Sequence, residues 1–305
     1  MNKKNYVAVA TLAFAMLTSC AGQKEAKSTS GIDLANMDTT VSAGTDFFRY
    51  ACGGWNDAHP LTAEYSRYGT FVELFENSQK QLRELIEGLA AQKNNQAGSA
   101  AQKIGDLYNM AMDSVTLNKQ GAEPVKAMLD KIAGMKDKSE IVPMMTEMAH
   151  IGIGTYFHSC VYADPKNSSL NIFQMGQGGI NLGEKEYYLD TDSITQNIRE
   201  QYKLYIGKLF QLAGFSEADA QQKVADVMEI ETAIAKVSRS ATELRDPEAN
   251  YHKMSFDELK KTIAGIDWDA YMKGLGIQAP AELNVEQVEP IQEVARLMNT
   301  LPLSK

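Results

Sequence analysis

The sequence lacks every short motif that would by itself define an active site. It has no His-Glu-x-x-His pair for zinc, no Gly-x-Ser-x-Gly elbow, no Walker A loop and no Cys-x-x-Cys pair. None of its four histidines precedes a glutamate, and no two lie four positions apart. Because zinc-bound water is the simplest hydrolytic nucleophile for a helical protein, we expect no catalytic residue, metal ligand or cofactor in this chain. The histidines are His59, His150, His158 and His252.

Weaker patterns also carry little chemistry. His158 and Cys160 share a face of a predicted strand and could contact a metal ion, although a core or surface role is the more common one. Gly176 to Gly179 follows a strand but opens no helix, so it is a loop and not a dinucleotide cradle. Glu229 and Glu231 lie on different faces of a predicted helix and are expected to be solvated or salt-bridged.

An excess of positive charge is also missing. The chain has 30 Lys and Arg against 39 Asp and Glu, a formal net charge of -9. Nucleic acid and anionic membrane surfaces would be repelled at long range, so we expect no nucleic-acid partner. Hydrophobic residues make up 44% of the chain, enough for a sizeable core. No repeat of fixed period is present, which argues against a solenoid.

The N-terminus lacks an apolar run long enough to cross a membrane, which takes roughly twenty residues. Val7 to Leu17 is shorter, and it follows Lys3 and Lys4, so residues 1–19 read as a signal peptide. Leu-Thr-Ser-Cys at its end resembles the lipobox of bacterial lipoproteins, in which Cys20 would be lipidated. The alternative is an ordinary signal peptide with a chance cysteine.

This reading predicts an exported protein, anchored by lipid in a bacterial cell envelope. Residues 20–40, rich in Lys, Ser, Thr and Ala, then form a flexible tether. Several acyl chains on one cysteine give firm anchoring, since each buried methylene contributes about 0.8 kcal/mol. Cys52 and Cys160 are the two cysteines that remain, and in an exported protein they could pair. The sequence alone does not decide this.

Most of the body carries the apolar spacing of helices, which predicts a mainly α fold. Pro124 lies in a first-turn position, Gly134 ends the same helix, and Ser139 is a candidate cap for the next. Ser255 with Glu258 is typical of a capping box. The predicted helices cover residues 71–89, 104–112, 124–134, 139–148, 193–213, 216–237, 256–263 and 290–300.

One β-hairpin interrupts the helices. Residues 152–162 and 170–175 are rich in β-branched and aromatic residues, and Asp164-Pro165-Lys166-Asn167-Ser168-Ser169 between them is turn chemistry. The expected fold class is therefore a helical domain with a small hairpin insertion.

Four blocks in order resemble the neprilysin-like zinc endopeptidases, the family of neprilysin, endothelin-converting enzyme and bacterial oligopeptidase O. Asp46 to Trp55 reads Asp-Phe-Phe-Arg-Tyr-Ala-Cys-Gly-Gly-Trp, and Tyr65 to Phe71 reads Tyr-Ser-Arg-Tyr-Gly-Thr-Phe. Gly179 to Leu189 resembles the family's Gly-Leu-Pro-x-x-x-Tyr-Tyr-Leu block, with Gly183 in place of the proline. Glu243 to Met254 resembles its Arg-x-Asp-Pro…Tyr-Asn-Lys-Met block.

The resemblance implies that residues 41–305 form the N-terminal, mainly helical half of such a peptidase, incomplete at its C-terminus. In the family this region helps to enclose a cavity that admits oligopeptides. The zinc, its His-Glu-x-x-His helix and a further Glu ligand belong to the second half of the chain, so zinc is a cofactor of the complete family enzyme. A separate catalytic half is a possible partner.

Arg67 matches the family arginine that binds the free C-terminal carboxylate of short substrates. A guanidinium pairs bidentately with a carboxylate, which suits the role. The alternative is an arginine that caps helix carbonyls or pairs with Glu73. Cys52 matches a cysteine that in animal members is tied to the catalytic half, whereas Asp246 and Asn250 are expected to brace the turn around Pro247.

The leading hypothesis is the substrate-enclosing part of a zinc metalloendopeptidase, inactive by itself. A second hypothesis is a non-enzymatic, peptide-binding surface lipoprotein that has kept the cavity wall. A third is a helical glycan-binding lipoprotein, which the four peptidase blocks and the absence of repeats disfavour.

Overall fold

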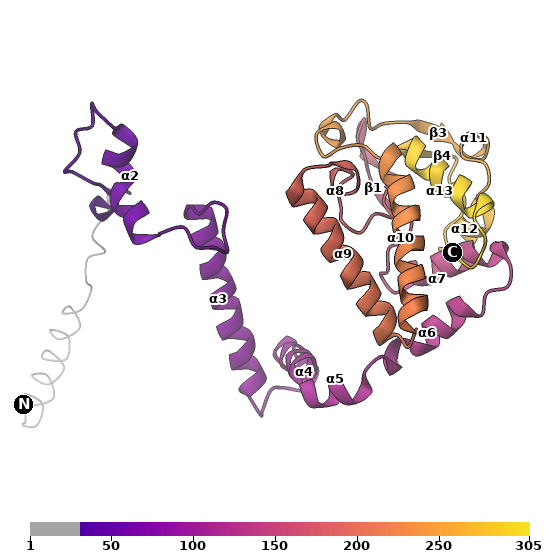
Figure 1. Ribbon diagram of the computed structural model, residues 1–305, viewed down its shortest axis with the longest axis horizontal. Coiled ribbons are helices and arrows are strands. Elements are labelled where there is room, and N and C mark those ends of the chain that lie inside the picture. The colour runs from indigo at the N-terminus through magenta and orange to yellow at the C-terminus, as the bar shows by residue number, and fades with distance from the viewer. Residues whose placement is uncertain (1–30) are drawn as a thin grey trace, which may run out of the picture. The chain divides into compact units, whose positions relative to one another are not determined.

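The computed structural model describes residues 31–305, so the predicted signal peptide and Cys20 lie outside the described residues. The described chain forms two compact units that divide between Met112 and Asp113, which Figure 1 draws in indigo to purple and in magenta to yellow. Within residues 31–305, no helix is both long enough and apolar enough to cross a bilayer.

The first unit is built from a short turn, η1 (Leu34–Asn36), and three helices, α2 (Phe47–Ala58), α3 (Thr70–Ala91) and α4 (Ala100–Met112). Arg49 on α2 holds the segment that precedes the helix through an ion pair with Asp38. Its Nε donates to Asp38 at 2.8 Å, while its two terminal nitrogens hold both oxygens of Asp57 at 2.8 and 2.7 Å. Residues 33–40, which the sequence assigned to the tether, therefore pack against α2.

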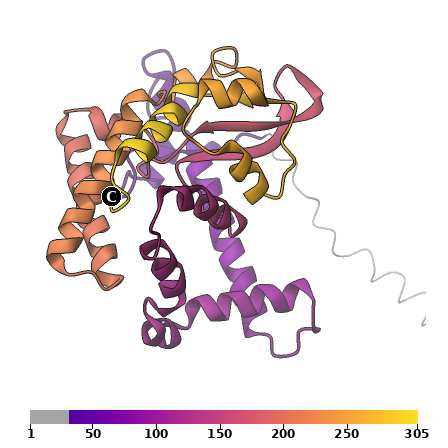
Figure 2. The same ribbon diagram turned by 90° about the vertical axis from the view of Figure 1, so that its right-hand side faces the viewer.

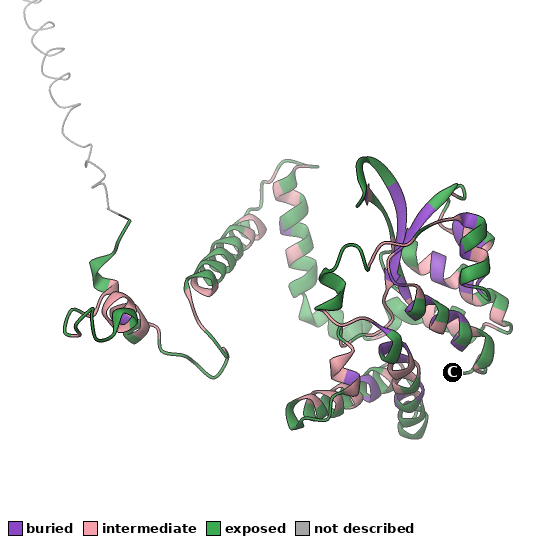
Figure 3. Cartoon of the chain, turned by 90° about the horizontal axis from the view of Figure 1, so that it is seen from above, coloured by how far each residue is buried: buried purple, intermediate pink, exposed green. Residues whose placement is uncertain are grey.

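Burial in the first unit is slight. Among its described residues, only Gly53 and Gly105 are buried: Gly53 lies against Asp38 and Arg49, and Gly105 lies where α4 packs on α3. The apolar stripe predicted along residues 71–89 is helical but lies exposed, with Phe71 at 89% and Phe75 at 60%. Figure 3 shows this contrast, since buried residues gather in the second unit.

Helices at the start of the second unit follow their sequence signals. Pro124 lies in the first turn of α6 (Glu123–Ala133), and Gly134 ends it as predicted. The cap of the next segment differs from the prediction: Asp137, not Ser139, accepts the backbone N–H, and Glu140 completes a capping box. An aspartate two residues earlier competes for the same role. The remaining elements here are α5 (Ser114–Gln120), η2 (Lys138–Glu140) and α7 (Ile141–His150).

A four-stranded sheet in the order β1-β2-β4-β3 forms the centre of the second unit. The predicted hairpin is confirmed as β1 (Phe157–Asp164) and β2 (Asn167–Gln177), antiparallel and joined through Pro165 and Lys166. The short strands β3 (Lys253–Ser255) and β4 (Glu282–Val285) extend it, with β4 parallel to β2. Figure 2 shows the long hairpin with the C-terminal helices packed beside it.

The main core lies between this sheet and the later helices. Met175, Leu283, Ile234, Ile291 and Trp268 are at most 2% exposed. Helices α9 and α10 run side by side in Figure 1, and α10 also packs on α13. The fold is thus mainly α with a small sheet, as predicted. The helices are α8 (Glu186–Leu189), α9 (Ser193–Leu212), α10 (Glu217–Val237), η3 (Glu243–Arg245), α11 (Phe256–Thr262), α12 (Trp268–Gly274) and α13 (Val288–Thr300).

Candidate functional site

The loop between α2 and α3 carries Arg67, and its neighbours are fixed by stacked rings. Trp55 on α2 stacks on His59 with ring centroids 4.4 Å apart, and on Tyr68 at 6.0 Å. Tyr65 packs edge-on against Tyr68 at 5.4 Å. Aromatic contacts of this kind have specific geometry, so they attach the loop to the end of α2 on both sides of Arg67.

Glu76, in the second turn of α3, fastens the same loop to a second helix. Its Oε1 accepts the Tyr65 hydroxyl at 2.7 Å and its Oε2 accepts the Tyr68 hydroxyl at 2.5 Å. The bond to Glu76 raises the pKa of Tyr68 to about 12, and the two hydroxyls lower the pKa of the Glu76 carboxyl. One carboxylate therefore holds the backbone on either side of Arg67.

The Arg67 side chain itself is exposed and has no hydrogen bond or ion pair with any residue from 31 to 305. The alternative pair with Glu73 is not formed, and the Glu73 carboxylate instead accepts the indole N–H of Trp55 at 3.4 Å. The guanidinium is thus free on a braced loop. Its role in binding substrate stays a prediction.

Glu231 on α10 is buried rather than solvated or salt-bridged, which corrects the sequence expectation. It is 4% exposed and accepts hydrogen bonds from Tyr188 at 2.7 Å, from Tyr202 at 3.0 Å and from Asn181 at 2.5 Å. Burial raises the pKa of both tyrosines. Glu229, on the other face, forms the expected ion pair, with Lys305. Tyr188 of the Tyr-Tyr-Leu block therefore anchors α8 to α10, and Tyr202 anchors α9 to it.

The loop at residues 243–250 is braced by its own side chains, as predicted. Asp246 Oδ1 accepts the backbone N–H groups of Glu248 at 3.0 Å and Ala249 at 3.1 Å. Asn250 Nδ2 donates to the carbonyls of Glu243 at 2.9 Å and Asp246 at 2.6 Å. Asp246 and Asn250 thus build the turn around Pro247 and leave no free donor for chemistry.

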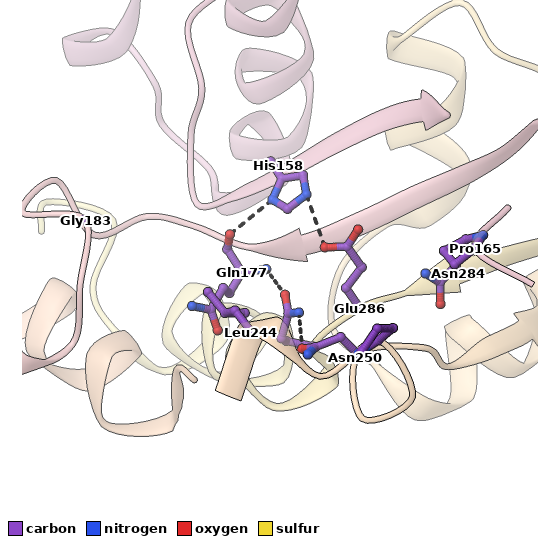
Figure 4. A pocket seen from close by; sticks show the side chains of 10 residues that line it. His158, Pro165, Gln177, Gly183, Leu244, Asn250, Asn284 and Glu286 are labelled. Carbon is purple, nitrogen blue, oxygen red and sulfur yellow. Dashed lines mark hydrogen bonds and ion pairs between the residues drawn. The ribbon is translucent and has the colours of Figure 1, made fainter. Parts of the chain in front are cut away.

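A pocket of about 450 Å³ opens between this loop, the end of β2 and the junction of β4 with α13 (Figure 4). His158 lies over it, with Nδ1 3.2 Å from the Gln177 carbonyl and Nε2 3.6 Å from Glu286 Oε2. A Cβ on Gly176 would meet both side chains, at 2.3 Å from His158 and 2.6 Å from Glu286. The absence of a side chain at Gly176 leaves room for His158 and Glu286 to lie over β2 at this point.

The floor of this pocket is a chain of side-chain amides, drawn in Figure 4. The backbone N–H of Gln177 donates to Gln287 Oε1 at 2.9 Å, and the side-chain Nε2 of Gln287 donates to Asn250 Oδ1 at 2.7 Å. Arg239 Nη1 donates to the same Asn250 oxygen at 3.0 Å. These amides satisfy one another, so they fix the shape of the pocket.

The histidines do not gather around a common point. His59 and His150 bond to the carbonyls of Trp55 and Gly274, both at 2.8 Å, and His252 bonds to the Val285 carbonyl at 3.0 Å. Among residues 31–305, no three His, Cys, Asp or Glu side chains are placed to hold a metal ion. The described residues therefore do not fit a zinc site, which takes three or four protein ligands.

The two cysteines of the described chain are free thiols and do not pair with each other. Cys52 is half-buried on α2, and Cys160 is exposed on β1. Burial raises the pKa of the Cys160 thiol, and the Glu286 carboxylate adds to this. A neutral thiol is a poor metal ligand, which further disfavours a site made from His158 and Cys160.

Comparison with known proteins identifies the family. The model of peptidase family M13 that describes its N-terminal region matches residues 43–305. This chain belongs to peptidase family M13. Endothelin-converting enzyme 1 of Rattus norvegicus is 31% identical over 284 residues, covering 88% of this chain and 35% of that protein. The neprilysin-like resemblance of the four blocks is thereby confirmed.

Solved structures agree with the M13 assignment. The zinc metalloprotease Zmp1 of Mycobacterium tuberculosis, solved with an inhibitor, superposes with a TM-score of 0.78 at 27% identity, over 90% of this chain and 42% of that one. PepO from Lactobacillus rhamnosis HN001 shares the fold, with a TM-score of 0.67 at 16% identity, over 87% of this chain and 41% of that one. The chain thus spans about a third of the length of its curated relatives and about two fifths of these structures.

Proposed function

We propose that this M13 chain is the substrate-enclosing, N-terminal part of a zinc metalloendopeptidase that acts on oligopeptides. In this proposal the chain binds the C-terminal end of the peptide, and the catalytic zinc with its ligands comes from residues outside the 305. Residues 1–305 then have no peptidase activity by themselves. Hydrolysis requires a catalytic half, on the same or on a separate polypeptide.

The observation that carries the proposal is the free guanidinium of Arg67 on a loop fixed to two helices. A ligand carboxylate could take both terminal nitrogens, because no side chain of residues 31–305 competes for them. The aromatic stack and Glu76 hold the loop before any peptide arrives, which lowers the entropic cost of binding. Both features support a preformed site for a free peptide C-terminus.

We further propose that the protein is exported and anchored through a lipidated Cys20 to the membrane of a bacterial envelope. The short apolar run and the Leu-Thr-Ser-Cys sequence support this. Replacement of Cys20 by Ala should release the protein from the membrane fraction and remove the acyl mass from its N-terminal peptide. Membrane association that survives the replacement would contradict the anchor.

Peptide affinity tests the Arg67 site directly. Fluorescent pentapeptides with a free or an amidated C-terminus are titrated with the full chain, and binding is followed by anisotropy. Loss of a charge-assisted hydrogen bond costs about 1.5–3 kcal/mol. Arg67→Gln should therefore weaken binding of the free peptide roughly tenfold to a hundredfold and leave the amidated peptide unchanged.

The matched control is Arg83→Gln, which removes a second exposed arginine of the same unit, one that lies on α3. This variant should bind both peptides as the unaltered chain does. Equal affinity of the free and amidated peptides for the unaltered chain would remove Arg67 from the substrate site. If both arginine variants lost peptide affinity equally, the effect would come from long-range electrostatic attraction and not from a contact with Arg67.

A further inference from the structure

The pocket of Figure 4 contains a carboxylate that accepts no hydrogen bond from any side chain of residues 31–305. Glu286 is held by its backbone, since its N–H donates to the Met175 carbonyl at 2.7 Å. Its side chain is 28% exposed, and within residues 31–305 its one charged neighbour is His158, at 3.6 Å. That separation is too long for a hydrogen bond. The carboxylate is open to solvent, so a ligand that brings a charged donor can replace the water on it.

The hydrogen bond of His158 determines which of its ring nitrogens faces Glu286. Because a carbonyl can only accept, the bond to the Gln177 carbonyl places a proton on Nδ1. In the neutral ring Nε2 then presents a lone pair toward Glu286, and the two groups do not attract each other. The carboxylate therefore remains available to the donor of an incoming ligand.

Three cations near the pocket are already engaged. Arg239 donates to the Ala249 carbonyl and to Asn250. Lys166 pairs with Glu248 at 2.6 Å, and Lys253 pairs with Glu282 at 2.8 Å. Of the residues that line the pocket, His158 and Glu286 are the two that can carry charge. With a neutral imidazole, the lining carries a single negative charge.

We propose that this pocket binds the basic side chain of a polypeptide segment, with Glu286 as its anchor. The guanidinium of arginine fits better than the ammonium of lysine, because its planar fork matches one carboxylate bidentately. Pro165, Pro247 and Leu244 line the pocket and offer apolar surface to the aliphatic stem. The site uses none of the residues around Arg67, and it stands whether or not Arg67 binds substrate.

The test uses N-acetylarginine N-methylamide, a probe with no free carboxylate for Arg67. Its neutral control is the citrulline analogue, which has the same shape. The full chain has only four histidines, so carbon–proton NMR of the imidazole rings resolves each one, and His158→Gln assigns the relevant signal. The arginine probe should shift the His158 signal saturably at millimolar concentrations, and the citrulline analogue should not.

Glu286→Gln should weaken the arginine probe roughly tenfold, since one charge-assisted pair is lost. Glu289→Gln, which removes an exposed carboxylate just outside the pocket, should leave the affinity unchanged. The proposal fails if citrulline binds as well as arginine, if neither shifts the signal, or if the two glutamate variants behave alike. The comparison of the two probes requires no substitution, so it holds even if a variant folds poorly.

Discussion

The buried carboxylate of Glu231 allows the sharpest stability prediction. Glu231→Ala removes the acceptor shared by Tyr188, Tyr202 and Asn181. Tyr188 is 3% exposed and cannot reach water, so its hydroxyl proton is left without an acceptor, although its oxygen still accepts the Leu182 N–H at 2.9 Å. Asn181 is exposed and Tyr202 is half-buried, so these two groups regain water and lose less.

The expected cost follows from these exposures. A buried donor without a partner costs about 1–3 kcal/mol. We assign that full cost to Tyr188 and a smaller one to its two neighbours, which gives about 2–4 kcal/mol for Glu231→Ala. Glu231→Gln keeps one acceptor oxygen and relieves the desolvation of a buried charge, so it should cost about 1–2 kcal/mol.

Urea unfolding measures the difference. Trp268 is buried in the second unit, and its indole N–H donates to the Ile263 carbonyl at 2.8 Å, so its fluorescence reports the loss of that core. Trp55 belongs to the first unit, and a Trp55→Phe background removes its signal. The reasoning is refuted if Glu231→Ala stays within about 0.5 kcal/mol of the unaltered chain. It is refuted equally if Gln is as damaging as Ala.

Three further predictions concern the same molecule. Burial raises the pKa of Tyr188 and Tyr202 in the folded chain, so their contribution to the free energy of unfolding is complete below about pH 10 and is lost as the pH rises further. The urea midpoint of the second unit should therefore fall above that pH, and it should fall less steeply when both tyrosines are replaced by Phe. Gly54→Ala places a Cβ 2.2 Å from a carbonyl of η1, so limited proteolysis should cut the segment before α2 faster, whereas Gly88→Ala, in open space, should not change the rate. Glu76→Ala frees the loop that carries the substrate arginine, so the affinity for peptides with a free C-terminus should fall severalfold while amidated peptides are unaffected.

Local sequence signals predicted eight of the helices in the described chain but missed α2 and the three short helices α5, α8 and α12. Pro124 and Gly134 bound one helix, and Ser255 with Glu258 forms the predicted capping box. The hairpin was also found, although its strands run closer to the turn than predicted. The turn itself needs only Pro165 and Lys166. Signals within a few residues of one another were therefore sufficient for these elements.

Features that depend on distant residues were missed. Strands β3 and β4 have three and four residues, too few for a recognisable period, and they exist because β2 offers its edge. Glu231 sits in a helix whose polar positions look alike in sequence, and only the arrival of Tyr188 and Tyr202 buries it. The His158–Glu286 pocket depends on a strand pairing between residues more than a hundred positions apart. No local pattern predicts such a meeting.

The central claim is that these 305 residues receive a peptide but do not hold the catalytic zinc. Zinc content and cleavage of a quenched fluorescent oligopeptide, measured on one purified sample with and without added zinc, test it most directly. The account predicts less than stoichiometric zinc and no cleavage in either condition. One tightly held zinc per chain, together with turnover by this chain alone, would contradict it.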